Sequence, residues 1–420
     1  MHDNKIQSRL KAQLTKFCAE LCANLSRPLE KFACQMLFGI QASQDVKLSN
    51  IARSLKEEIP LIDTEKRLSR NLKAEELEKQ LTPQLVSMGS QRVRPHTVLA
   101  LDLSDIRKEY AQKMEYLATV HAGSSGEWHQ GYWLCDVTAA EGNGSEIVPL
   151  YQKLYSAEAK DFRSENDEIL AAVDLIRSHT QGRGIWVIDR GGDRKKLLEP
   201  LLERSERFVI RSTGKRSVVD RRNRCGTVAE VAGRCKLTHK ARIVKVQDGQ
   251  EKVYDLRYGA VPIQLPGRSD KLWLVVIAGF GAERLMLLTN LPVTARDSQS
   301  AWWIVPIYLT RWKIEETFRF VKQSYNLEDI RVMKYRRLKN LVTLVTAAAY
   351  FAATFLGQQM KLRILCEKLL IISQRFFGIP PFRFYALADG IRQILSQATL
   401  SPPEAPPASL QLELTLGWEG

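Results

Sequence analysis

The chain has 420 residues, enough for two or three folded domains, and its 45% hydrophobic and 26% charged residues are ordinary for a soluble globular protein. Its 62 Lys and Arg residues exceed its 47 Asp and Glu residues, and the net charge of +15 favours a polyanionic partner, either nucleic acid or an anionic membrane. The seven cysteines are scattered and odd in number, which argues against a disulfide-rich secreted scaffold and favours a reducing compartment.

Helix-forming residues dominate the first part of the chain. Residues 1–94 are rich in Leu, Lys, Glu and Ala and show no alternating strand pattern, so we expect an all-helical N-terminal domain. The polar opening residues do not resemble a signal peptide, which favours a cytoplasmic protein.

A segment that resembles a helix-turn-helix lies within this part. A short helix at 48–55, a break at 59–61 and a second helix at 63–72, begun by a capping residue, are typical of such DNA readers. The alternative is an ordinary helical hairpin that packs its leucines together. The basic side chains expected to recognise DNA ends all lie on the second helix: Lys66, Arg67 and Arg70.

Two apolar strands in the middle of the chain each end in a carboxylate. Residues 97–102 end at Asp102, and residues 184–189 end at Asp189. The order of elements is three strands, a helix, a strand, a helix and a strand, which is typical of a ribonuclease-H-like α/β sheet. The other predicted elements are strands at 114–120, 131–137 and 207–211 and helices at 164–179 and 195–204.

A β-rich insertion is expected at residues 212–300. Short alternating strands are predicted there at 241–246, 252–258, 271–277 and 284–288. The pattern Cys225-x9-Cys235-x3-His239 has neither a CxxC knuckle nor a fourth ligand, which disfavours a zinc site. The insertion opens with a basic run for which DNA contact and a solvated loop are both open interpretations: Lys215, Arg216, Arg221 and Arg222.

The most informative motif follows the insertion. Residues 308–322 read Y-x2-R-x3-E-x6-K. On a continuous helix these four side chains fall within an arc of roughly 60°, with Arg319 beside them. A carboxylate among cations and a phenol suits a site that binds a metal ion and holds phosphate, whereas the alternative is a solvated helix face with ion pairs. The four residues are Tyr308, Arg311, Glu315 and Lys322.

An apolar run at 341–356 is the only membrane candidate in the sequence. It is shorter than the ~20 residues that span a bilayer and contains three threonines, so we expect a buried helix and no membrane partner. The net charge is then interpreted as affinity for DNA. The predicted division of the chain is 1–94, 95–211, 212–300, 301–345, 346–400 for a C-terminal helical region, and 401–420 for a flexible tail.

We expect the carboxylates of Asp102, Asp189 and Glu315 to meet at one edge of the sheet. If the two strands are neighbours, the carboxylates at their ends lie close together, and Glu315 completes a trio. Mg²⁺ prefers oxygen ligands and keeps positions open for phosphate and water. Two such ions about 3.5–4 Å apart activate the attacking oxygen and stabilise the leaving oxygen in phosphoryl transfer.

Three other acidic residues near these positions are weaker candidates. Asp105 lies three residues beyond Asp102, so on a continuing strand it faces the other side of the sheet. Asp193 stands at the start of a predicted helix, where an Asp more often acts as a cap. Glu316 points about 100° away from the face that carries Glu315.

Together, the strand ending in Asp102, the segment Ile188-Asp189-Arg-Gly-Gly-Asp193 and the Y-R-E-K element resemble the bacterial insertion-sequence DDE transposases. More narrowly, residues 95–345 resemble the Y-R-E-K branch, the insertion-sequence-four family. This resemblance implies a ribonuclease-H-like catalytic core with a β-strand insertion, preceded by an all-helical N-terminal DNA-binding domain. It also implies two Mg²⁺ ions, replaceable by Mn²⁺, held by Asp102, Asp189 and Glu315, with Tyr308, Arg311, Lys322 and Arg319 binding DNA phosphates.

The resemblance further implies cut-and-paste transposition on double-stranded DNA. Water cleaves the transposon ends, and the freed 3′-hydroxyl is then joined to target DNA. Members of the family pair two ends as dimers, so we expect a homodimer on DNA in the bacterial cytoplasm, associated with the nucleoid. Several release the element through a hairpin and stack a flipped base on a tryptophan, for which Trp273, Trp302 and Trp303 are all open candidates.

Two other functions are compatible with these residues. A ribonuclease-H-like nuclease or resolvase would cut DNA without joining it, but it would not need the N-terminal reader and the phosphate-binding face. A silenced transposase would survive as a DNA-binding regulator, although all three carboxylates and the Y-R-E-K spacing are intact.

Overall fold

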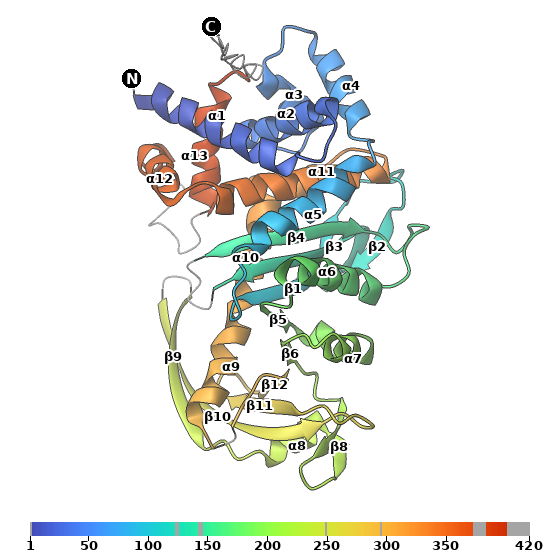
Figure 1. The fold of residues 1–420 in the computed structure, drawn as a ribbon, viewed down its shortest axis with the longest axis vertical. Helices are drawn as coiled ribbons and strands as arrows, with labels where there is room; N and C mark the ends of the chain where they lie inside the picture. The colour runs from blue at the N-terminus through green and yellow to red at the C-terminus, as the bar shows by residue number, and fades with distance from the viewer. Residues whose placement is uncertain are drawn as a thin grey trace, which may run out of the picture.

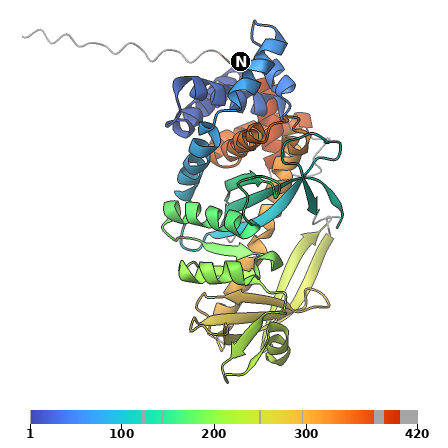
Figure 2. The same ribbon diagram turned by 90° about the vertical axis from the view of Figure 1, so that its right-hand side faces the viewer.

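The structure, a computed structural model, describes residues 2–121, 126–141, 146–247, 250–294, 296–372 and 384–400. Figures 1 and 2 show an elongated molecule in which helices from the N-terminal and C-terminal parts of the chain together form one end. A mixed sheet with helices against it forms the middle, and a second group of strands forms the other end. The predicted tail at 401–420 lies outside the described residues.

The N-terminal part is helical, as predicted. Helices α3 and α4 match the predicted helical pair, but α4 begins at Leu61 after Pro60, without a side-chain cap bond. The prediction that a capping residue begins this helix at residue 63 is therefore wrong. The helix begins directly after a proline, whose fixed φ suits a helix start. The helices of this part are α1 (His2–Leu21), α2 (Arg27–Ser43), α3 (Leu48–Leu55), α4 (Leu61–Asn71) and α5 (Glu76–Ser90).

The central part follows the predicted order of helix, strand, helix and strand from α6 to β6, but in the described chain four strands precede α6 instead of the predicted three. Strands β4, β3 and β1 are antiparallel neighbours, whereas β1, β5 and β6 run parallel, so the order across the sheet is β4-β3-β1-β5-β6. Helix α6 (Glu165–Thr180) precedes β5, and α7 (Lys195–Glu203) precedes β6. The strands are β1 (Val98–Arg107), β2 (Ala118–His121), β3 (Trp128–Ala140), β4 (Ile147–Tyr155), β5 (Ile185–Ile188) and β6 (Phe208–Arg211).

The prediction of the first three strands was partly wrong. Of the expected strand at 114–120, only the end is extended and pairs as β2 with β3, because Tyr116 has a φ of 55° and the chain turns there. The third core strand is instead β4, which was not predicted. It contains Pro149, which pairs with Thr138 beside a bulge, where a strand tolerates a missing N–H.

The β-rich insertion extends the same sheet. Strand β12 pairs antiparallel with β6, so in the described chain the sheet continues as β6-β12-β11-β10-β7-β8, with β9 on β10. The four predicted strands correspond to β9–β12, whereas the short elements β7, β8 and α8 were not predicted. The insertion contains β7 (Ser217–Asp220), β8 (Cys225–Thr227), α8 (Val228–Arg234), β9 (His239–Gln247), β10 (Gln250–Gln264), β11 (Leu272–Ala278) and β12 (Leu285–Thr289).

The Y-R-E-K segment forms two helices instead of the single helix that the spacing assumed. Helix α9 (Ser298–Thr310) and helix α10 (Trp312–Ser324) meet at Arg311. The backbone N–H of Arg311 bonds to Tyr308 O at 3.1 Å, three residues back, and the Thr310 hydroxyl bonds to a carbonyl of the preceding turn. Such bonds tighten and bend a helix, so Arg311 stands at a junction.

Helix α11 joins the N-terminal helices to the sheet. Gln41 Nε2 donates to Ala348 O at 2.7 Å, and Thr346 Oγ1 donates to Gln152 Oε1 on β4 at 2.9 Å. The described segment Tyr335–Phe355 is long and apolar enough to cross a membrane, but 89% of its apolar window is buried, as predicted for a core helix. This part comprises α11 (Tyr335–Tyr350), the π-helical turn η3 (Phe351–Phe355), α12 (Gln358–Ile372) and α13 (Phe384–Ser396).

Candidate active site

Asp102 and Asp189 lie side by side on neighbouring strands, as predicted, but the predicted strand end at Asp102 is wrong, because β1 continues to Arg107 and only β5 ends directly before its aspartate. Strands β1 and β5 are parallel neighbours, and Leu101 stands opposite Ile188, so Asp102 and Asp189 occupy matching positions one residue further on. Asp189 leaves the strand and accepts a hydrogen bond from the backbone N–H of Gly191 at 2.7 Å. The strand pairing therefore fixes Asp102, and the turn after β5 orients Asp189.

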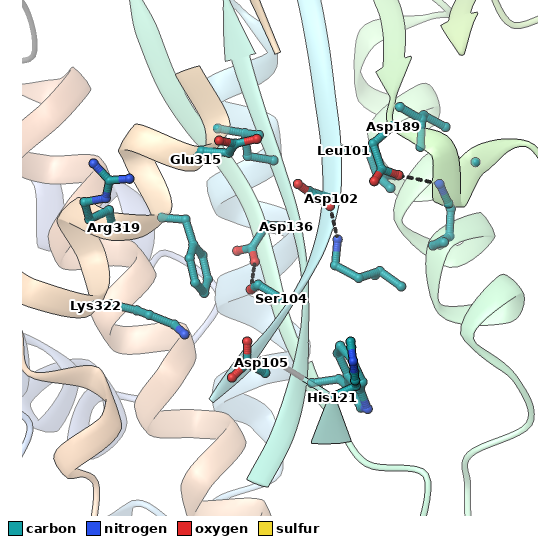
Figure 3. A pocket seen from close by; sticks show the side chains of 18 of the residues that line it. Leu101, Asp102, Ser104, Asp105, His121, Asp136, Asp189, Glu315, Arg319 and Lys322 are labelled. Carbon is teal, nitrogen blue, oxygen red and sulfur yellow. Dashed lines mark hydrogen bonds between the residues drawn. The ribbon is translucent and has the colours of Figure 1, made fainter. Parts of the chain in front are cut away.

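Glu315 faces the same groove from helix α10. The groove has a volume of about 790 Å³, and all three predicted carboxylates line it. Figure 3 shows Asp102 between Glu315 on the helix side and Asp189 on the side of the neighbouring strand. The fold thus brings together three oxygen-bearing side chains that lie up to about two hundred residues apart in the chain.

Arg311 bridges two of these carboxylates. Its Nη1 lies 3.0 Å from Asp102 Oδ2, and its Nη2 lies 2.7 Å from Glu315 Oε1. The residue is only 9% exposed, and its buried Nε has no hydrogen-bond partner among the described residues. Its guanidinium therefore stands where a cation shared by Asp102 and Glu315 would bind.

The electrostatic surroundings make Asp102 hard to ionise. Burial, and after it the negative charge of Asp189, raise the pKa of Asp102 to about 6 against the opposing positive charge of Arg311. A buried carboxylate beside a second one attracts a positive charge, because each anion disfavours ionisation of the other. The site therefore favours a cation between the two carboxylates.

The chemistry of the donor set fits a hard divalent cation, since carboxylate oxygens are the ligands that Mg²⁺ prefers. Within the described residues, however, no three acidic, histidine or cysteine side chains form a ready-made metal cluster. The guanidinium of Arg311 is hydrogen-bonded to one oxygen of Asp102 and one oxygen of Glu315.

The cations predicted to bind phosphate differ in their placement. Lys322 and Arg319 line the groove beside Glu315 (Figure 3). Lys322 Nζ lies 3.0 Å from Glu328 Oε1, and Arg319 is exposed. Tyr308 does not line the groove: it is 4% exposed and packs with the apolar side chains between α9 and the sheet. Arg319 and Lys322 thus line the groove from α10, and Arg194 lines it from the start of α7.

The transposase DDE domain model matches residues 94–351 of this chain, more than half of its length. The chain belongs to this transposase family. Members are DNA-cleaving enzymes that act by phosphoryl transfer, so the groove described above belongs to a DNA transposase.

Other comparisons add less. No curated protein matches the transposase. Among solved structures, it is similar to a piggyBac transposase in a cryo-EM synaptic complex with hairpin DNA, with a TM-score of 0.44 and 11% identity. That similarity covers 96% of this chain and 86% of the other. The family membership rests on the sequence match alone.

Asp136 is a groove residue of the transposase that the sequence analysis missed. It stands directly opposite Asp102 on β3, and burial raises its pKa to about 7. Its carboxyl accepts hydrogen bonds from Gln152 Nε2 at 2.6 Å and from the Ser104 hydroxyl at 3.2 Å. A lone acid inside the otherwise apolar stretch at 131–137 was the signal available in the sequence.

The weaker acidic candidates have separate partners. Asp105 also lines the groove, so the expectation that it faces away was wrong, and its Oδ2 lies 2.9 Å from His129 Nε2. The side chain of Asp193 is fully buried: its carboxylate forms an ion pair with Arg216 and accepts hydrogen bonds from the Ser212 hydroxyl and the Thr213 N–H. Asp193 therefore connects the turn after β5 to the first residues of the insertion.

The basic residues predicted to recognise DNA ends fall into two groups at opposite ends of the molecule (Figure 1). On α4, Lys66 and Arg70 are exposed, whereas Arg67 pairs with Glu57 at 2.6 Å and donates to Gln35 at 2.7 Å. At the start of the insertion, Arg216 is paired with Asp193, while the remaining candidates are exposed: Lys215, Arg221 and Arg222.

The candidate tryptophans for base stacking and the cysteines of the disfavoured zinc pattern lie away from the groove. None of Trp273, Trp302 and Trp303 lines it, and Trp302 packs against Tyr258 with ring centroids 5.2 Å apart. In the described chain, Cys225 is exposed, Cys235 is buried, and neither belongs to a metal-binding cluster.

Proposed function

We propose that this transposase is a ribonuclease-H-like enzyme that moves an insertion sequence by Mg²⁺-dependent cut-and-paste transposition. The observation that carries the proposal is the convergence of Asp102, Asp189 and Glu315 on one groove that also holds Arg319 and Lys322. The strand order β4-β3-β1-β5-β6, with its antiparallel and parallel halves, supports the ribonuclease-H-like core.

The protein residues have separable tasks in this proposal. Asp102, Asp189 and Glu315 would hold Mg²⁺, which when bound activates the attacking oxygen and stabilises the leaving oxygen. Arg319 and Lys322 hold the phosphate beside the carboxylates, since both line the groove. The buried hydrogen bonds of Asp136 keep β3 and β1 in register behind Asp102.

We further propose that the two basic surfaces contact double-stranded DNA on either side of the groove. The elements that carry them lie at opposite ends of the molecule, with β1, β5 and α10 between them (Figure 1), and this arrangement suits a duplex that passes the active site. A homodimer that pairs two ends, membership of the Y-R-E-K branch and a bacterial cytoplasmic, nucleoid-associated location complete the proposal.

The test uses the full chain, Mg²⁺ and a plasmid that carries the gene with its native flanks. Asp189→Asn is the control variant, because its amide oxygen still accepts the Gly191 hydrogen bond while its charge is lost. Release of the element and joining to a second plasmid, both absent in the variant, are expected. Cutting without joining would indicate a nuclease, and flank binding without cutting would indicate a silenced regulator.

The ion pair of Arg67 leads to a prediction about DNA binding by α4. Lys66→Ala and Arg70→Ala should each weaken DNA binding and lower the salt dependence of the affinity by about one phosphate contact, because both side chains are exposed. Arg67→Ala should instead lower the free energy of unfolding by about 1–3 kcal/mol, since it leaves Glu57 and Gln35 without their partner. Fluorescence anisotropy at several salt concentrations measures the DNA affinity, and urea unfolding measures the stability. If Arg67→Ala lowers the salt dependence as much as Lys66→Ala and Arg70→Ala do, the prediction is wrong.

A further inference from the structure

A buried cation of the protein, Arg311, already pairs with two of the carboxylates that line the groove. Arg311 spans Asp102 and Glu315 with its two terminal nitrogens, and its charge is permanent because guanidinium does not lose its proton in proteins. We propose that Arg311 is an internal counter-ion that opposes metal binding until a DNA phosphate takes it over. The proposal rests on the metal site of the proposed function and adds how that site is regulated.

Competition follows from the atoms involved. Asp102 and Glu315 would help to hold the metal ion, and one oxygen of each, Asp102 Oδ2 and Glu315 Oε1, now accepts a hydrogen bond from Arg311. The guanidinium and the ion would compete for the negative charge of these carboxylates, and their positive charges repel each other at such short range. Metal binding therefore includes the free energy of breaking two charge-assisted hydrogen bonds.

A phosphate is the ligand best suited to release Arg311. Two parallel N–H groups of arginine match two phosphate oxygens, and Arg311 Nε is buried without a partner in the described chain. A phosphate placed by Arg319 and Lys322 would lie in the same groove. It could offer Arg311 more acceptors than the single oxygen that each carboxylate now presents.

The position of Arg311 in the chain favours such a movement. The residue stands at the junction of α9 and α10, where the backbone hydrogen bonds shift to three-residue spacing. Arg311 is the residue between the two helices, and its side chain can release the carboxylates by a change of rotamer. Asp102, in contrast, is fixed by its place within β1.

The role proposed for Arg311 couples DNA binding to metal binding. If a phosphate removes Arg311 from the carboxylates, DNA raises the affinity for metal, and metal raises the affinity for DNA by the same factor. The transposase would then hold metal firmly only when DNA lies in the groove. Without DNA, the arginine bridge keeps the carboxylates neutralised and the groove free of metal.

The experiment measures Mn²⁺ affinity of the full chain by electron paramagnetic resonance, with and without a short DNA duplex. Without DNA, Arg311→Ala is expected to bind Mn²⁺ about 5–150-fold more tightly than the parent protein. Arg319→Ala, the matched control, removes one charge from the same groove but no carboxylate bridge, and should change the affinity far less. DNA should raise Mn²⁺ affinity in the parent protein and in Arg319→Ala, but little in Arg311→Ala.

A second variant of Arg311 controls for misfolding of Arg311→Ala. Arg311→Gln keeps much of the side-chain volume while removing the charge, and it should show the same gain in Mn²⁺ affinity. Equal affinities in the Arg311 and Arg319 variants, or an equal effect of DNA on all proteins, would overturn the inference. Loss of the metal site itself would be seen separately, because Glu315→Gln and Asp189→Asn would then leave Mn²⁺ affinity unchanged.

Discussion

Glu315→Gln should abolish DNA cleavage while leaving DNA binding largely intact. The change removes one negative oxygen ligand from the groove but almost no volume, so α10 keeps its packing. Losing a metal ligand removes several kcal/mol of transition-state stabilisation, which corresponds to at least about a thousandfold fall in the cleavage rate. Cleavage of a flank-bearing duplex and its binding by anisotropy, measured on the same preparation, check both parts.

The neighbouring residue supplies the control for this variant. Glu316 is on the same helix, but it pairs with Lys313 at 3.1 Å and does not line the groove. Glu316→Gln should therefore keep full cleavage activity. A parallel loss of binding and cleavage in Glu315→Gln would show that Glu315 supports the DNA surface or the fold instead of holding metal.

The sequence predicted the carboxylate trio because each member follows from a local rule. The apolar runs that lead into Asp102 and Asp189 predicted two strands that each carry an aspartate, and the parallel pairing of β1 with β5 brings these two positions together, although β1 continues beyond Asp102. Glu315 could be selected by its spacing from Arg311 and Lys322 alone. Local patterns of this kind need no knowledge of distant contacts.

The partners of the charged residues could not be predicted in the same way. Arg67 pairs with Glu57 and with Gln35, which lies 32 residues away, and Arg216 pairs with Asp193 across the turn that leads into the insertion. Spacing shows where a cation lies on a helix, but the tertiary fold decides whether an acid lies opposite. Arg67 and Arg216, which were predicted to contact DNA, therefore form ion pairs within the protein.

Long-range pairing explains the remaining errors. Strand β4 was missed because Pro149 interrupts its pattern, and only the bulge on β3 shows why a proline is tolerated there. The arginine bridge was missed for a related reason, since Arg311 contacts Asp102 at a separation of 209 residues. Both features depend on a neighbour that the local sequence does not contain.

The buried ion pair of Asp193 leads to the largest expected effect on stability. Its carboxylate is fully buried, and Arg216 is only 13% exposed. Asp193→Ala leaves that guanidinium without a counter-charge and removes the acceptor for the Ser212 hydroxyl and the Thr213 N–H. Breaking a buried pair from one side costs about 3–5 kcal/mol, so urea unfolding should show a loss of that size.

A surface pair of the same chemistry provides the comparison. Asp174 and Arg204 are joined at 2.7 Å, but Asp174 is 53% exposed, so Asp174→Ala should cost no more than about 1 kcal/mol. If the two variants lose equal stability, Arg216 finds water or another acid once Asp193 is gone. A large loss for Asp193→Ala with one cooperative transition would instead show that the core and the insertion unfold together, because this pair joins the turn after β5 to residues 212–216.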